Sequence, residues 1–366
     1  MSNRPVNPPA SQLKKGQPPN DRKQQRVGGR VGLRIARVCL QWSVFALVCQ
    51  AACVLLGNSS PLLELGVHFS AHAWVANLTV ACLLFLLKAP RTATIAVLLF
   101  ASLTPLVEPW NWIPTSTAAT QATGPAQAET LASPEAVLNV ARTDPARSKL
   151  KVLCWNVLVV NNEISEIEAI VAREDPDIIV FIEVRPGFLD AIQSTAANYP
   201  IVKNLPYWGG EGIAVLSRLP GTEYELLDLG FERMPTVLAR VPGSTQELQL
   251  VALHTLSPIP PFRARIRDNQ LASLLKWSTD QTKPICVCGD FNTTPWTRGF
   301  QTLIRGGFVD SRVGVGNLPS WPAALGPLGL PIDHAITKGG CTISNRQVLA
   351  SGPGSDHRPI VFEVSY

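Results

Sequence analysis

Polar residues that could bind a metal ion or move a proton recur along this 366-residue chain where short apolar segments end. They are carboxylates, amides and imidazoles: Asn156, Glu183, His254, Asp290, Asn292, Asp333, Asp356 and His357. An apolar strand that ends in such a residue places a polar group at the rim of a sheet. A layered fold can gather several rims into one pocket, so we expect these side chains to share a site.

The carboxylates predict a divalent metal ion. Glu183 and Asp356, together with Asp290 and the amide oxygen of Asn156, are hard oxygen ligands. Such ligands suit Mg²⁺ or Mn²⁺ better than zinc. A phosphoester needs its negative charge neutralised during attack, and a metal ion can do this as a Lewis acid.

The remaining polar residues predict proton transfer and substrate contacts. His254 and His357 can donate or accept a proton near neutral pH. Asp333 could orient His357 and favour its protonated form. Asn292 could position an attacking water, and Arg185 could hold a phosphate oxygen.

The helices and strands that carry these residues begin near Lys149. The patterns at Ile164–Glu174 and Arg263–Trp277 predict amphipathic helices. Short apolar runs predict strands, and several of these have no helix between them: LKVLCWNV, DIIVFIEV, GIAVLSR, TVLARV, LQLVALHT, PICVCGDFN, PIDHAIT and PIVFEV. Because strands outnumber helices, we expect two packed, mostly antiparallel sheets flanked by helices rather than one doubly wound sheet.

The ordered motifs resemble the endonuclease/exonuclease/phosphatase superfamily, which includes deoxyribonuclease I, abasic-site endonucleases, neutral sphingomyelinases and inositol polyphosphate 5-phosphatases. The resemblance runs from about Lys149 to Tyr366 and is carried by WNV, IEVR, GIAVLSR, ALHT, CGDFNTTP, PIDHAIT and SDHRPI. It implies a four-layered α/β sandwich and a metal-dependent hydrolase acting on phosphoester bonds.

The resemblance also implies roles for the metal-site and water-binding residues. Asn156 and Glu183 are similar to the family's metal-site residues, and Asp356 lies close to them in the motif order. Asp290 and Asn292 resemble the pair that handles the nucleophilic water.

For the histidines, the resemblance makes His357 the catalytic histidine with Asp333 as its partner. His254 resembles the second histidine of the deoxyribonuclease-like members. No clear match exists for the catalytic tyrosine of abasic-site endonucleases, which argues against that activity. The block Ser320–His334 resembles a membrane-attached bacterial branch with hydrophobic N-terminal segments.

The N-terminal part predicts a membrane anchor. Residues 1–30 form a basic, polar stretch that we expect to be disordered. Within 31–107, three apolar segments predict transmembrane helices: Val38–Gly57, Val67–Leu87 and the shorter Thr92–Val107. Residues 108–148 predict a flexible linker before the catalytic domain at 149–366. The alternative is a buried helical hairpin of a soluble domain, but these segments show almost no polar face.

The basic residues predict the orientation of this anchor. The first 40 residues carry nine Lys and Arg against one Asp, and the second connection carries Lys88 and Arg91. The positive-inside rule then places both in the cytoplasm. Three crossings put the catalytic domain outside the cytoplasm, in a multi-pass protein of the inner cell membrane. If the third segment does not cross, the domain lies inside.

Charge and cysteine usage exclude some classes. From Leu150 onward the chain has eighteen Lys and Arg against twenty-one Asp and Glu, so it lacks the wide basic footprint of a non-specific nucleic-acid binder. The eight cysteines form no CxxC pair or Cys/His cluster. We interpret most of them as small buried apolar residues rather than as a disulfide framework.

These observations predict a membrane-anchored phosphodiesterase that uses Mg²⁺ or Mn²⁺. A phospholipid, a nucleic acid or a small phosphodiester could be the substrate. An extracytoplasmic nuclease of the deoxyribonuclease type is the alternative activity, and an inactive binding module is the alternative class. The oligomeric state does not follow from the sequence.

Overall fold

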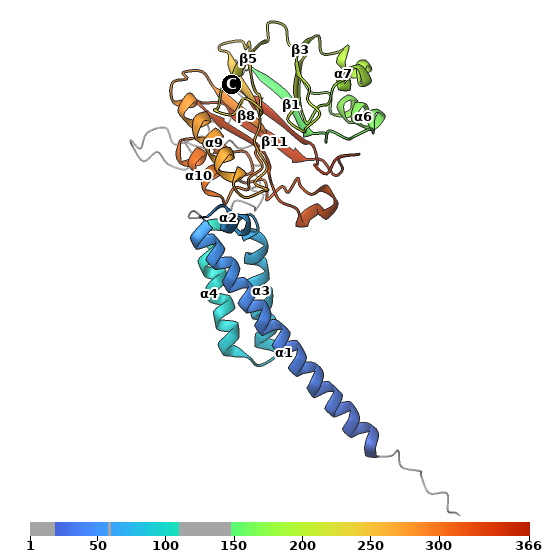
Figure 1. Ribbon diagram of the computed structural model, residues 1–366, viewed down its shortest axis with the longest axis vertical. Helices are drawn as coiled ribbons and strands as arrows, with labels where there is room; N and C mark the ends of the chain where they lie inside the picture. The colour runs from blue at the N-terminus through green and yellow to red at the C-terminus, as the bar shows by residue number, and fades with distance from the viewer. Residues whose placement is uncertain (1–18, 58–59, 110–147) are drawn as a thin grey trace, which may run out of the picture.

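The computed structural model describes residues 19–57, 60–109 and 148–366 (Figure 1). Two six-stranded sheets form the part after residue 148, and helices cover their outer faces. The result is an α/β sandwich, as the motifs predicted. The N-terminal helices form a separate bundle that projects from one end of the sandwich.

The first sheet has the order β11-β12-β1-β2-β4-β3. Strands β1 and β2 pair in parallel, and all other neighbouring strands of this sheet pair antiparallel. Its strands have these bounds: β1 Lys149–Asn156, β2 Ile178–Ile182, β3 Ile201–Leu205, β4 Ile213–Ser217, β11 Thr342–Val348 and β12 Ile360–Ser365.

The second sheet has the order β5-β6-β7-β8-β10-β9, again with one parallel pair, β7 and β8. Its strands have these bounds: β5 Glu223–Leu227, β6 Thr236–Val241, β7 Leu248–His254, β8 Ile285–Asp290, β9 Val309–Asp310 and β10 Asp333–Lys338. Both sheets are therefore mostly antiparallel, as expected.

The central strands are buried on both faces, which explains their continuous apolar runs. Along β1, Val152 and Cys154 point into the core between the sheets, whereas Leu153 and Trp155 pack under the outer helices. Since side chains alternate along a strand, one apolar segment serves both layers. None of the eight cysteines, all within the described ranges, forms a disulfide, and the four of the sandwich are buried, as expected: Cys154, Cys286, Cys288 and Cys341. The expectation of burial is wrong for Cys39, Cys49 and Cys82, which are exposed on the apolar N-terminal helices.

Two groups of helices complete the four layers. The first sheet is covered by α6 (Ile164–Glu174), α7 (Phe188–Ala191) and α8 (Gln193–Ala196). The second is covered by α9 (Arg263–Thr279) and α10 (Arg298–Arg305). A short 3₁₀ segment, η3 (Ala323–Leu328), precedes β10.

The N-terminal bundle contains α1 (Pro19–Leu56), α2 (Pro61–Val67), α3 (Ser70–Leu86) and α4 (Pro90–Val107). Two stretches, Val31–Leu56 and Pro90–Val107, are long and apolar enough to cross a membrane. The pair α2 and α3 meets the same test together but bends by 56° at the break between them. The bundle thus has up to three candidate spans.

Two expectations for the N-terminal part need comment. Residues 19–30, predicted to be disordered, belong to α1, because Gln, Lys and Arg favour helix and extend the apolar helix beyond its own end. Residues 1–18 and most of the expected linker, 110–147, lie outside the described residues. The expected segment Val67–Leu87 is one helix only from Ser70, since the chain turns sharply at His68 and Phe69.

Candidate active site

The ends of the two parallel strand pairs bring the predicted polar residues to one place. Asn156 ends β1, and Glu183 follows the last residue of β2. In the other sheet His254 ends β7 directly beside Asp290 at the end of β8. Asp333, the first residue of β10, lies opposite Asp290 in the antiparallel pair of β10 and β8. Parallel neighbours end at the same edge of a sheet, so both edges deliver their polar residues to the same side of the sandwich.

Two glycines allow the backbone to pass closely at these ends. A Cβ on Gly289 would lie 1.7 Å from the carbonyl oxygen of Leu253, and its φ of 152° also favours glycine. A Cβ on Gly212 would lie 2.0 Å from the carbonyl oxygen of Val184. The glycines of CGDFN and GIAVLSR are thus required by strand packing just beside Asp290 and Glu183.

Asn156 joins the two sheets through its side chain. Its Nδ2 donates to Glu183 Oε1 at 2.9 Å and to Asp290 Oδ2 at 3.1 Å, while its Oδ1 accepts from the backbone of Leu158. Glu183 is held at a φ of 62°, which is unusual for a residue other than glycine and is often found at functional sites. The strand-end turn thus directs the Glu183 carboxylate towards the opposite sheet.

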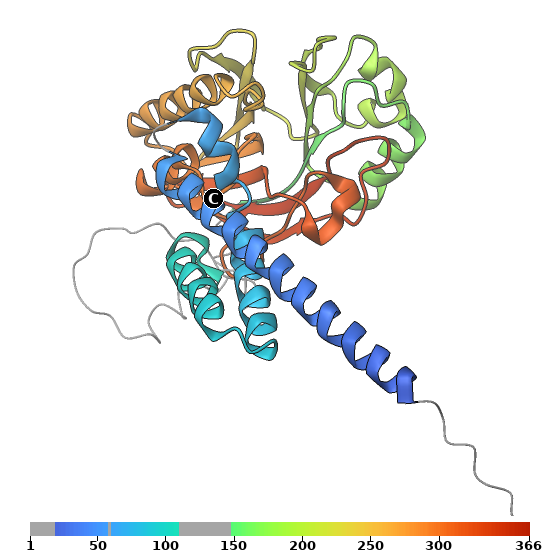
Figure 2. The ribbon, with the colours of Figure 1, turned by 60° about the horizontal axis from the view of Figure 1, so that its bottom comes forward.

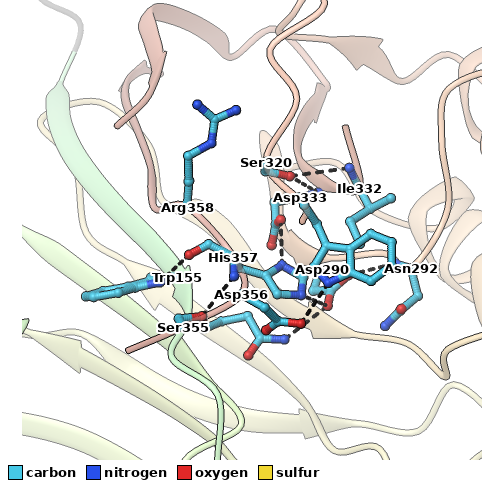
Figure 3. A network of polar contacts seen from close by, with 12 residues as sticks. Trp155, Asp290, Asn292, Ser320, Ile332, Asp333, Ser355, Asp356, His357 and Arg358 are labelled. Atoms are coloured by element: carbon cyan, nitrogen blue, oxygen red, sulfur yellow. Dashed lines mark hydrogen bonds and ion pairs between the residues drawn. The ribbon is translucent and has the colours of Figure 1, made fainter. Parts of the chain in front are cut away.

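His357 lies between two carboxylates (Figure 3). Its Nδ1 is 2.8 Å from Asp333 Oδ2, and its Nε2 is 3.6 Å from Asp290 Oδ2. Burial alone would lower the pKa of His357, but the charges of Asp333 and Asp290 outweigh it and raise the pKa to about 10. His357 is therefore an imidazolium at neutral pH. Ser355 supports it by accepting from its backbone N–H at 3.0 Å.

The pKa values of Asp290 and His254 are shifted in opposite directions. Burial raises the pKa of Asp290 to about 7, with a further increase from Asp333, although His357 opposes it. Burial, assisted by the positive charge of His357, lowers the pKa of His254 to about 3. His254 is thus a neutral imidazole, with Nε2 at 3.8 Å from Asp290 Oδ2. A carboxyl with a pKa near neutrality is suited to accept a proton from water.

Asn292 is fixed beside Asp290 by its backbone. It adopts a φ of 46°, which asparagine tolerates, and its N–H donates to Asp290 Oδ1 at 2.8 Å. Its Nδ2 donates to the carbonyl of Thr255 at 2.9 Å. The DFN turn therefore holds the carboxyl and the amide in one fixed arrangement.

Asp356 is exposed and accepts a hydrogen bond of 2.8 Å from Trp321 Nε1. Its charge helps to raise the pKa of Glu183, although burial of Glu183 is the larger cause. Arg185 is the predicted residue that lies apart. Its guanidinium donates to Asn162 Oδ1 at 3.1 Å, and it does not line the cavity described below.

The donor set fits a divalent cation. Glu183 and Asp290 share the Asn156 amide, and within the described ranges no Lys or Arg forms an ion pair with Glu183 or Asp356. Asp290, Asp333 and His357 also offer ligand atoms within 4.8 Å of one another. However, the hydrogen bond between Asp333 Oδ2 and Nδ1 of the protonated His357 already occupies these two atoms. We therefore favour the side formed by Glu183 and Asp356, whose carboxylates lack a neutralising cation. Asn156 lies beside Glu183, but it turns its Nδ2 to that carboxylate while its Oδ1 accepts from Leu158.

Six of the predicted site residues line one cavity of about 1120 Å³: Glu183, His254, Asp290, Asn292, Asp356 and His357. Asn156 and Asp333 contact them from outside the lining. The sequence had not pointed to several of its other lining residues, among them Arg233, Arg263, Leu65, His68 and Phe69. No sequence motif contains these residues: Arg233 lies in a loop, Arg263 begins α9, and the other three belong to the N-terminal bundle. Ser320 was also missed. Its Oγ accepts from the N–H of Asp333 at 3.2 Å and contributes to lowering the pKa of that carboxyl.

Solved structures are similar to this chain at low sequence identity. The crystal structure of humanized D. rerio TDP2 with 14 mutations is 18% identical, has a TM-score of 0.51, and covers 59% of this chain and 98% of its own. A mannosyl-6-phosphatase from Bacteroides thetaiotaomicron is 16% identical with a TM-score of 0.46, covering 59% of this chain and 100% of its own. No curated protein matches the sequence significantly.

A model of the endonuclease/exonuclease/phosphatase family matches most of the sandwich. The match spans residues 153–357, which is more than half of the sequence and includes every residue of the site from Asn156 to His357. The sandwich fold and the motif order agree with it. The chain belongs to the endonuclease/exonuclease/phosphatase family.

Proposed function

We propose that this protein is a membrane-anchored, divalent-metal-dependent phosphoester hydrolase, and more closely a phosphodiesterase that acts outside the cytoplasm. The observation that carries the proposal is that Glu183, Asp290 and His357 line one cavity and that the buried Asn156 links Glu183 to Asp290. These groups come from both sheets, so only the packed sandwich assembles them.

Glu183 and Asp356 would hold the metal ion, and Asn156 would join them with its amide turned so that Oδ1 faces the ion. Mg²⁺ and Mn²⁺ fit these oxygen donors. Such an ion supplies charge neutralisation at the phosphoryl group and at the leaving oxygen. The raised pKa of Glu183, caused first by its burial, supports this assignment, because a cation would relieve the cost of its buried charge.

The chain's own residues would carry out proton transfer and charge stabilisation. Asp290 accepts a proton from water as the water oxygen attacks phosphorus in line, and Asn292 helps to position that water. The imidazolium of His357 stabilises the negative charge that develops on the phosphoryl oxygens. Asp333 keeps His357 protonated and oriented. His254, a neutral imidazole, can donate a hydrogen bond in the same region.

Hydrolysis of bis-p-nitrophenyl phosphate tests this proposal. The purified full-length protein in detergent should release p-nitrophenol with Mg²⁺ or Mn²⁺, lose at least about 90% of its rate in excess EDTA, and recover when the metal is restored. Release of p-nitrophenol is followed by absorbance. Equal rates with and without EDTA, or no hydrolysis with any divalent ion, would overturn the metal-dependent mechanism.

The bundle supports the membrane part of the proposal. Many large apolar side chains on its outside are exposed, including Trp42, Phe45, Phe85 and Leu98, as expected for lipid-facing surfaces. The basic α1 beginning and the connection at Lys88 lie at the end of the bundle away from the sandwich (Figure 1). By the positive-inside rule that end would face the cytoplasm.

Protease accessibility tests the orientation. In intact spheroplasts, externally added protease should degrade a C-terminal epitope tag after Tyr366, whereas a tag before Met1 should survive until the membrane is permeabilised. Immunoblotting of both tags reads the result. Survival of the C-terminal tag in sealed spheroplasts would place the sandwich in the cytoplasm instead.

A further inference from the structure

The N-terminal bundle contributes a wall of the cavity. Leu65 at the end of α2 and Phe69 at the break before α3 line the same cavity as Asp290 and His357. We call the segment from Pro61 to Ser70 the elbow. In Figure 2 the elbow, in lighter blue, lies beside the orange α9 of the sandwich.

Polar and apolar contacts attach the elbow to the active-site loop. Glu64 forms an ion pair with the fully buried Arg267, whose guanidinium also donates to the carbonyl of Asn292 at 3.1 Å. His68 Nδ1 lies 3.2 Å from Thr294 Oγ1, two residues after Asn292. Trp296 packs against the elbow residue Val67. The elbow is therefore tied to the DFN turn, and its place at the cavity is specific.

The rim of the cavity is apolar and exposed. Its large side chains come from three separate segments, and each keeps half or more of its surface exposed: Phe69, Tyr207, Trp208, Ile259 and Phe262. Exposed apolar residues gathered at one cavity mark a binding or membrane-facing surface. Because α3 begins one residue after Phe69, the rim lies where the apolar bundle meets the sandwich.

Arg263 provides positive charge inside this apolar frame and lies next to the rim residue Phe262. Arg233 also lines the cavity, where it forms an ion pair of 2.7 Å with the lining residue Glu211. Guanidinium groups bind phosphate oxygens well. The cavity therefore combines an anionic-group binding wall, a hydrolytic floor and an apolar mouth at the end of the membrane bundle.

We propose that the substrate is an amphiphilic phosphoester taken from the bilayer, with its phosphate on the cavity floor and its apolar chains along the rim. This rests on the proposed hydrolase function. In the reaction, one water oxygen bonds to phosphorus, the bond from phosphorus to the leaving alcohol oxygen breaks, and the alcohol takes up the proton. A nucleic acid fits less well, because the sandwich has a slight acidic balance and the mouth is apolar.

The test compares lipid and soluble substrates on the full-length protein. Dioleoyl phosphatidylcholine vesicles containing protein receive dioleoyl phosphatidylglycerol, dioleoyl phosphatidate or a polyprenyl monophosphate, and phosphorus-containing products are measured by mass spectrometry. Bis-p-nitrophenyl phosphate and a single-stranded oligonucleotide are the soluble substrates. We expect at least one lipid to be cleaved with a kcat/KM at least about 10-fold above that for either soluble substrate.

Rim variants show whether the apolar mouth is responsible. Phe69→Ser and Phe262→Ser should each lower the ratio of lipid to soluble kcat/KM by about 10-fold, since each removes a large apolar contact. Leu226→Ser on the edge strand β5, exposed and outside the cavity lining, is the matched control and should leave this ratio unchanged.

The outcomes separate this inference from the function on which it rests. Cleavage of bis-p-nitrophenyl phosphate without cleavage of any of the lipids would overturn the lipid assignment and leave the hydrolase standing. Preference for the oligonucleotide, or an unchanged ratio in both rim variants, would also overturn it. Absence of all hydrolysis would instead count against the hydrolase proposal.

Discussion

An Asp290→Asn variant should lower kcat/KM for bis-p-nitrophenyl phosphate by about 10²–10⁴-fold, the range usual for loss of a general base. Asn has the same shape as Asp but cannot take a proton from the attacking water. Asp290 is buried, carries a pKa raised to about 7 by that burial, and contacts Asn156 and His357. Steady-state hydrolysis with saturating Mg²⁺ measures the effect.

The control is Asp190→Asn, which changes an exposed carboxyl in α7 outside the cavity lining. It should retain activity within about twofold. Thermal unfolding of both variants should show that the sandwich stays folded. In Asp290→Asn, the side-chain oxygen at position 290 can still accept the hydrogen bond from the backbone N–H of Asn292. A folded Asp290→Asn protein with near-normal turnover would remove Asp290 from the mechanism.

A His357→Gln variant should lose about 100-fold or more in kcat, because Gln can donate a hydrogen bond but cannot carry the positive charge. The charge arises from the neighbours of the ring: Asp333 and Asp290 outweigh burial and raise the pKa of His357 to about 10. The loss should be seen mainly in kcat, since the imidazolium stabilises charge that develops in the transition state.

A mutant cycle with Asp333 distinguishes this role from simple packing. Asp333 contacts His357 at 2.8 Å and acts through it, so Asp333→Asn should itself lower kcat. In the His357→Gln background the same change should add little, because residues that act as a unit are not additive. Full additivity of the two losses, or near-normal turnover of folded His357→Gln, would contradict the assigned pair.

Local pattern was sufficient for the central elements of the sandwich. The helix Ile164–Glu174 and the strand Thr236–Val241 have the predicted bounds, and the other predicted strands match to within a few residues. These segments lie in the middle of the layers, where one or both faces are buried, so their apolar residues recur with a clear period. The order of the motifs added the prediction of a four-layered α/β sandwich, which the family match supports.

The strands that the sequence did not predict are at sheet edges. β3, β5, β9 and β11 end the two sheets, and β3 and β5 have mostly half-buried or exposed residues. An edge strand packs on fewer neighbours and tolerates polar side chains, so its pattern is weak. The sharp turn at His68 and Phe69 was missed for a related reason. An apolar run shows that a segment is apolar but not where contact with the sandwich bends it.

The residue types of the site could be predicted from local pattern, since each polar residue interrupts an apolar run where a strand ends. How they meet follows from the packing of the two sheets: Asn156 bonds Glu183 and Asp290, His357 is charged between Asp290 and Asp333, and Arg185 donates to Asn162 instead. The tertiary structure also makes the elbow a wall of the cavity. Distances and charges between segments far apart along the chain depend on how the sheets stack, and local periodicity carries no record of that stacking.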